Sequence, residues 1–199
     1  MSAKTIKGWH FIHADRRLAH EDARVVVAGE WLTVDGPLKL CEHGLHASRR
    51  AIDALGYLSW EPAIICRVEV VGDVVEEGNK MVARRRRVLW MAEADGCLHQ
   101  FALDVATEAL REHYPDAPDT LWTALDLRAA QLAGIDVPDE DMAAARASAR
   151  DAAWTAASAA AWASARDAAS AAASAAARDA QNIHLERLLS TLPRLGGAP

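Results

Sequence analysis

AIICRVEVV, residues 63–71, is the stretch that decides the fold. Its second half alternates apolar and charged side chains, which is the period of a β-strand with one buried face. Gly72-Asp73 follows as a turn signal, and residues 82–91 form another strand candidate that contains four consecutive arginines. The sequence therefore predicts β-structure through the middle of the chain's first half.

Toward the N-terminus, short apolar runs separated by turn residues continue the β-rich pattern. Residues 8–12 and 24–34 are predicted strands, and the second run ends at the turn signal of residues 35–37. Residues 48–58 carry a helix signature, with Ser48 as the candidate N-cap and apolar residues returning on one face.

Toward the C-terminus the pattern becomes helical. Helices are predicted over 99–112 and 119–132, and a third begins near Asp139, which follows a proline. We therefore predict an α+β protein. Its compact β-rich domain covers residues 1–95, and an all-helical region covers residues 96–199.

The predicted third helix contains a tetrapeptide repeat at residues 142–181, where a larger residue returns every four positions among alanines. Ala has the highest helix propensity, so one long Ala-rich helix is expected. The repeat is either a low-complexity spacer or a docking element. Trp154 and Trp162 favour docking, because large aromatic side chains are rarely left on a solvated rod. We therefore expect a homo-oligomer, with a host or viral protein as a further partner.

The composition excludes several classes of protein. Among 199 residues, 22 Lys+Arg stand against 28 Asp+Glu, and a net charge of −6 argues against generic nucleic-acid binding. No apolar run reaches the roughly 18–20 residues that span a bilayer, and the N-terminus lacks the apolar part of a secretory signal. Three cysteines are too few for a disulfide framework. These features predict a cytoplasmic protein.

The densest polar cluster is Cys41-Glu-His43-Gly-Leu-His46. Cys and His are zinc ligands, so a metal site is one interpretation, but no second ligand pair lies at a familiar spacing. The alternative is a small buried cysteine with exposed histidines. We predict that no metal is bound, because apolar side chains at 25–27, 31, 64–71 and 88–90 can form a core without one.

The arginine run at 84–87 allows two interpretations. If it is a strand, alternate side chains face opposite sides and only two arginines share a face. Two cations suit a phosphate or a dinucleotide better than a duplex, whereas a charged edge strand that resists aggregation needs no ligand. Phosphate-binding glycine loops are absent from the sequence.

Two family resemblances add to these observations. The run from Cys41 to Ser48, the helix after it and the strand at 64–71 resemble a small uncharacterised domain of phage and prophage proteins. That resemblance covers roughly residues 7–93 and extends loosely to the Ala-rich tail. It implies a viral or mobile-element context and no established activity.

The chain also resembles ADP-ribosyltransferase-like folds at a greater distance. In these folds a His on an early strand precedes a Gly-φ-[Tyr/His]-φ-[Ser/Ala] strand, a helix and a further strand, and residues 9–11, 44–48, 51–57 and 64–72 follow that order. The resemblance implies NAD or an ADP-ribose-like nucleotide as the ligand. It implies Glu93 as the catalytic residue and, as ligand-binding residues, His10, His46, Tyr57, Arg85 and Arg87.

Two functions are thus expected from the sequence. The first is a phage-type accessory protein that acts by binding and self-association through its helical region. The alternative is an ADP-ribosyltransferase-like domain that binds NAD or a related nucleotide.

Overall fold

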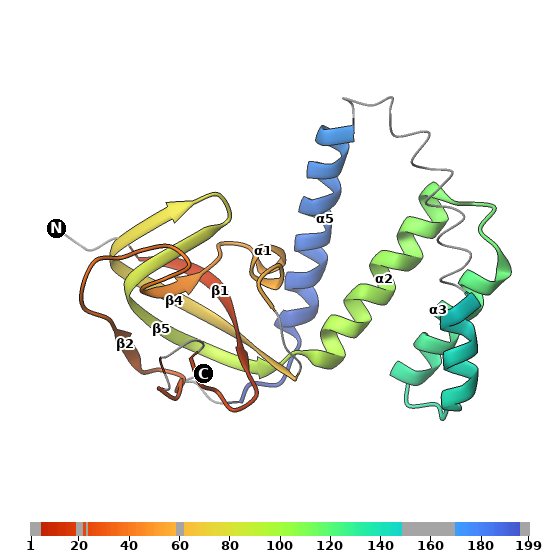
Figure 1. Cartoon of the computed structure of the whole chain (residues 1–199), viewed down its shortest axis with the longest axis horizontal. Helices are drawn as coiled ribbons and strands as arrows, with labels where there is room; N and C mark the ends of the chain where they lie inside the picture. Colours follow the sequence, from red (N-terminus) through yellow and green to blue (C-terminus); the bar gives the residue numbers. More distant parts are fainter. Residues whose placement is uncertain (1–4, 19–21, 23, 59–61, 149–169, 196–199) are drawn as a thin grey trace. The chain divides into compact units, whose positions relative to one another are not determined.

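The computed structural model describes residues 5–18, 22, 24–58, 62–148 and 170–195 (Figure 1). The chain divides into two compact units. Unit 1 comprises Met1–Cys97 together with Ala180–Pro199, and unit 2 comprises Leu98–Asp179. Unit 1 contains an antiparallel five-stranded sheet, and several helices follow it in the sequence, which confirms the predicted α+β class.

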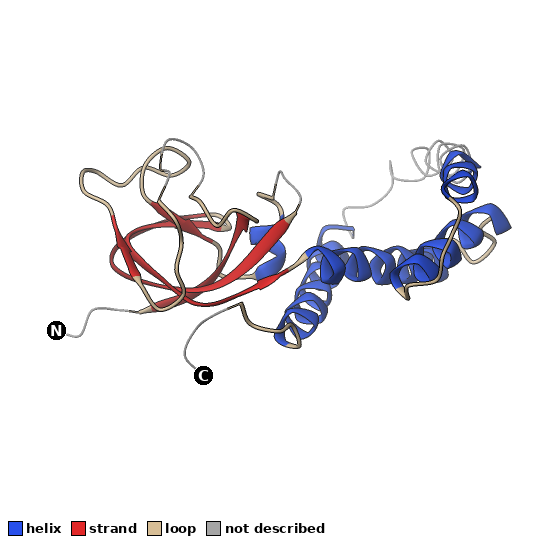
Figure 2. Ribbon diagram, turned by 90° about the horizontal axis from the view of Figure 1, so that it is seen from below, coloured by secondary structure: helices blue, strands red, loops and turns tan. Residues whose placement is uncertain are grey.

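The sheet of unit 1, whose strands are red in Figure 2, has the order β1-β4-β5-β2, and β3 pairs with another part of β5. All the pairings between these strands are antiparallel, and β4 and β5 form a long central hairpin. The strands are β1 (Ile6–His13), β2 (Trp31–Thr33), β3 (Leu45–Ala47), β4 (Ala63–Glu77) and β5 (Lys80–Glu93).

The sheet curls so that its strands return to the starting edge. Just beyond β3, Ser48 pairs with Trp9 of β1, and their backbones exchange hydrogen bonds of 2.7 and 2.9 Å. The pairings β1–β4, β4–β5 and β5–β3 therefore close into a ring around the core. Gly8 allows this close approach, because a Cβ atom there would lie 2.7 Å from the Ser48 carbonyl oxygen.

Apolar residues from all the strands fill the inside of this ring. Of the predicted core segment 25–27 only Val26 is buried, whereas Val25, Val27 and Trp31 are exposed. The expectation that all of them form the core was therefore wrong, because alternate residues of an extended chain face opposite sides. The core cluster comprises Ile6, Ile12, Val26, Ala47, Ile64, Cys66, Val68, Val70, Met81, Ala83, Val88 and Met91.

The hairpin turn lies later than the sequence predicted. Gly72-Asp73 is not a turn: β4 continues through it to Glu77, with a register shift between Val71 and Val74. Gly72 adopts a φ of +86°, which fits a β-bulge with a glycine at the inserted position. The chain reverses instead next to Gly78, whose φ is +58°.

The short helix α1 (Ala51–Leu55) receives its cap from a distant part of the chain. Ser48 is in the bridge to β1, so the predicted Ser48 cap was wrong, and Arg50 at the N-cap gives no side-chain capping hydrogen bond. Instead the backbone N–H of Ile52 donates to Asn182 Oδ1 at 3.1 Å, within unit 1. Asn182 belongs to the C-terminal part of α5 (Ser170–Ser190).

Unit 2 is helical in the part that the structure describes. The predicted helix at 99–112 is α2 (Asp95–His113), and the one at 119–132 is α3 (Asp119–Leu132). Residues 139–148 are helical too. Most of the tetrapeptide repeat, with Trp154 and Trp162, lies outside the described residues. None of the helices within the described ranges is long and apolar enough to cross a membrane.

The C-terminal segment joins the β-rich unit although the sequence grouped it with the helices. Leu185 and Leu189 of α5 are fully buried, and the Leu195 N–H donates to the Met91 carbonyl at 2.8 Å. Arg194 stacks on Trp90, with Cζ 3.3 Å from the ring centroid. Unit 1 thus combines the predicted β-rich segment with residues 180–199, and unit 2 is inserted between them in the sequence.

Candidate functional site

Arg86 is the most unusual polar residue of unit 1. Its side chain is 1% exposed, and it lies in β5 two residues before the core residue Val88. Nη1 donates a hydrogen bond to the His46 carbonyl, whereas Nε and Nη2 are buried and lack a partner among the described residues. Burial lowers the Arg86 pKa to about 10, so the guanidinium keeps its charge at neutral pH.

His10 of β1 interacts electrostatically with this cation. Its register partner is Cys66 of β4, which belongs to the core cluster. The pKa of His10 is well below 6.5, first because of desolvation and then because of the charges of Arg86 and His46. His10 is nevertheless half-buried rather than fully buried, so part of the residue reaches solvent. The ring is neutral at physiological pH.

His46 takes part mainly through its backbone. Its carbonyl accepts from Arg86, and its ring Nε2 accepts a 2.9 Å hydrogen bond from the backbone N–H of Cys41. A neutral His46 therefore carries its proton on Nδ1. Cys41 has a φ of +66°, in the left-handed region. Replacing the His46 side chain would leave the carbonyl that holds Arg86.

Arg85 and Arg87 project from the other face of β5. Because side chains alternate along a strand, these two arginines lie opposite to Arg86. Both stack on Trp31 of β2, with Cζ atoms 4.8 and 4.9 Å from the ring centroid, and Arg87 is also paired with Glu69. The structure therefore brings Arg86, rather than the predicted Arg85 and Arg87, together with His10 and His46.

The other two predicted site residues lie elsewhere. Tyr57 is 43% exposed and donates to Asn79, and the Lys80 ammonium lies 4.1 Å from its ring centroid. Glu93 is exposed at the end of β5, where it pairs in register with Ile64. Neither belongs to the cluster of Arg86, His10 and His46.

The predicted zinc ligands have other partners. Cys41 Sγ lies 3.0 Å from Lys80 Nζ, His43 Nε2 lies 2.6 Å from the Asp35 carbonyl oxygen, and His46 Nε2 accepts from Cys41. In the part of the chain that the structure describes, no three His, Cys, Asp or Glu side chains are grouped to hold a metal ion.

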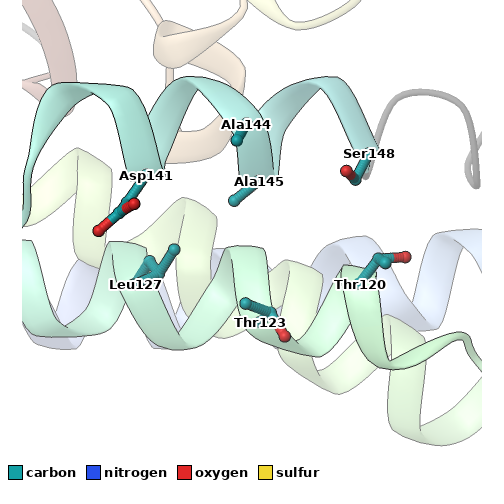
Figure 3. A pocket seen from close by; sticks show the side chains of 7 residues that line it. All are labelled: Thr120, Thr123, Leu127, Asp141, Ala144, Ala145 and Ser148. Atoms are coloured by element: carbon teal, nitrogen blue, oxygen red, sulfur yellow. The ribbon is translucent and has the colours of Figure 1, made fainter.

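Unit 2 carries a separate open pocket of about 350 Å³. Figure 3 shows that it lies between α3 and the helix at 139–148, with side chains from both helices facing each other. Small and hydroxyl side chains dominate its lining, and Asp141 is the charged residue. The lining residues are Thr120, Thr123, Leu127, Asp141, Ala144, Ala145 and Ser148. This lining offers an anion no cationic partner.

Part of the chain is similar to a known family. Residues 7–100, which contain nearly the whole sheet, match the model of a domain of unknown function (DUF7666). No curated protein and no solved structure matches the chain. The resemblance to an uncharacterised domain is confirmed over this range. The phage context and the resemblance to ADP-ribosyltransferase-like folds stay predictions.

Proposed function

We propose that unit 1 is a binding module for a small anionic ligand of the nucleotide class, such as NAD or ADP-ribose. The observation that carries the proposal is the buried Arg86 guanidinium, which has no carboxylate within hydrogen-bond distance in the described residues. An unpaired buried charge costs several kcal/mol in a folded protein. Such a cost is expected where the charge serves to bind a ligand of opposite sign.

The neighbours of Arg86 support the same proposal. The resemblance to ADP-ribosyltransferase-like folds implies that His10 holds the nicotinamide ribose and that His46 stacks on the nicotinamide. The charge of Arg86 acts on His10, and the His46 carbonyl accepts a hydrogen bond from Arg86. Glu93 lies outside this cluster. The proposal therefore concerns binding and includes no transfer step.

Isothermal titration calorimetry with NAD and with ADP-ribose tests the proposal. The full chain is expected to bind at least one of them below millimolar concentration, and Arg86→Met is expected to abolish binding. Arg85→Met is the matched control, because it removes an exposed arginine from the adjacent position of the same strand. Absence of binding to the full chain would refute the proposal, as would equal binding by Arg86→Met.

A second candidate function is self-association through unit 2. No residue of α3 is fully buried, although this 14-residue helix contains four leucines and Trp122. These apolar side chains suit a contact with a second copy of the chain, as in the expected phage-type accessory protein. Analytical ultracentrifugation is the test. We expect an oligomer of the 21.5 kDa chain, and a clean monomer at tens of micromolar would contradict this candidate.

A further inference from the structure

The nitrogen atoms of Arg86 divide into one that is used and two that are not. Nη1 donates to the His46 carbonyl, whereas Nε and Nη2 find no partner in the described ranges. The N–H groups of Nε and Nη2 point along the same edge of the planar guanidinium. Arginine binds a carboxylate or phosphate by two parallel hydrogen bonds on such an edge. The unused part of Arg86 is therefore a complete bidentate fork.

The described groups around this fork supply no anion to fill it. Asp22 attracts Arg86 electrostatically, but both of its carboxylate oxygens accept hydrogen bonds from Arg24. Arg24 Nε donates to Oδ1 at 2.8 Å, and Arg24 Nη2 donates to Oδ2 at 2.6 Å. Cys66 also lies near the guanidinium. Burial raises the pKa of its thiol to about 12, so the thiol is neutral and does not balance the charge.

The geometry points to an oxyanion site inside unit 1, in which the Nε–Nη2 edge of Arg86 binds one phosphoryl or carboxylate group. This inference rests on the proposed function and names the part of the ligand that Arg86 recognises. For a nucleotide the group is a phosphoryl, and a free carboxylate is the competing source of the same chemistry.

The fork explains why an arginine rather than a lysine suits this position. A lysine ammonium carries the same charge but is a point donor that cannot form two parallel coplanar hydrogen bonds. Each charge-assisted hydrogen bond is worth about 1.5–3 kcal/mol, which corresponds to about tenfold or more in affinity. Arg86→Lys therefore separates the geometry of the fork from its charge.

The experiment is calorimetric titration of the full chain with four probes: inorganic phosphate, AMP, adenosine and succinate. We expect AMP to bind and adenosine to bind about tenfold more weakly or worse, because adenosine lacks the phosphoryl group. Arg86→Lys is expected to lose about tenfold in AMP affinity, and Arg85→Lys, on the opposite face, is the control that keeps it. The NMR resonance of Arg86 Nε–H in the wild-type chain is expected to shift on addition of AMP, which provides a readout that needs no variant.

The outcomes separate this inference from the proposed function. Equal binding of AMP and adenosine, with an unshifted Nε–H resonance, would overturn the oxyanion site and leave nucleotide binding intact. Binding of phosphate or succinate alone would support the oxyanion site and contradict the nucleotide class. Failure of all four probes would overturn the inference, and failure of NAD and ADP-ribose as well would overturn both.

Discussion

Glu186 of α5 is the residue whose removal best tests how the C-terminal segment is bound to the β-rich unit. Its Oε1 atom accepts three hydrogen bonds, from Trp9 Nε1 at 3.0 Å, from the Ala51 backbone N–H at 3.3 Å and from Asn182 Nδ2 at 3.1 Å. Trp9 is 5% exposed and Ala51 is fully buried. Glu186→Ala leaves both of these donors without their acceptor.

The expected loss follows from these contacts. A buried donor that loses its partner costs about 1–3 kcal/mol, so two such donors cost about 2–6 kcal/mol. Glu186 itself is only half-buried, and water that reaches the site recovers part of the loss. The Glu186 carboxylate also stabilises the positive charge of the Arg67 guanidinium, whose Cζ atom lies 4.5 Å from the centroid of the Trp9 ring. We expect the free energy of unfolding of unit 1 to fall by about 2–4 kcal/mol.

Two measurements check this prediction. Urea unfolding followed by circular dichroism gives the change in stability, and amide hydrogen exchange by NMR gives the local change at Ala51. Glu186→Gln keeps an acceptor oxygen and is expected to retain most of the stability. Glu77→Ala, at an exposed position of β4, is the second control. An unchanged unfolding midpoint together with unchanged protection of the Ala51 amide would refute the reasoning.

Three further predictions concern unit 1. Ending the chain at residue 179 removes residues 180–199 and with them Leu185, a fully buried side chain worth about 1.5–3 kcal/mol, so thermal unfolding should show a clear drop in Tm. Gly8→Ala should cost about 1–3 kcal/mol in urea unfolding, because its Cβ would lie 2.7 Å from the Ser48 carbonyl oxygen. The pKa of the His10 imidazole is lower in the folded chain than in the unfolded chain, so the unfolded chain takes up a proton there at a higher pH. The contribution of His10 to the free energy of unfolding is therefore fully present above pH 6.5 and is lost as the pH falls toward the folded-state pKa. His10→Gln should make the free energy of unfolding less dependent on pH in this range.

The elements that could be predicted are those whose signals are local. Alternation of apolar and charged residues placed the first part of β4, up to residue 71, and the predicted helix at 119–132 has the same bounds as α3. The cap of α1 shows the opposite case. The backbone N–H of Ile52 donates to Asn182, 130 residues away in the sequence, and the backbone N–H of Ala51 donates to Glu186, 135 residues away. No local pattern around residue 51 could indicate them, because the contact exists only once the chain has folded.

The candidate site shows the same limit at the scale of a single residue. Strand alternation established that only two members of the arginine run share a face, but the core residues on the two sides of the run predict different pairs. Counting back from Val88 places Arg86 inward, whereas counting forward from Ala83 would place Arg85 there. The opposing strand changes register beside this run, at the bulge of Gly72-Asp73. Gly72, which the sequence presents as a turn, thus lies where the alternation of side chains no longer predicts which arginine faces the core. The pairing of β4 with β5 determines that Arg86 is the buried one.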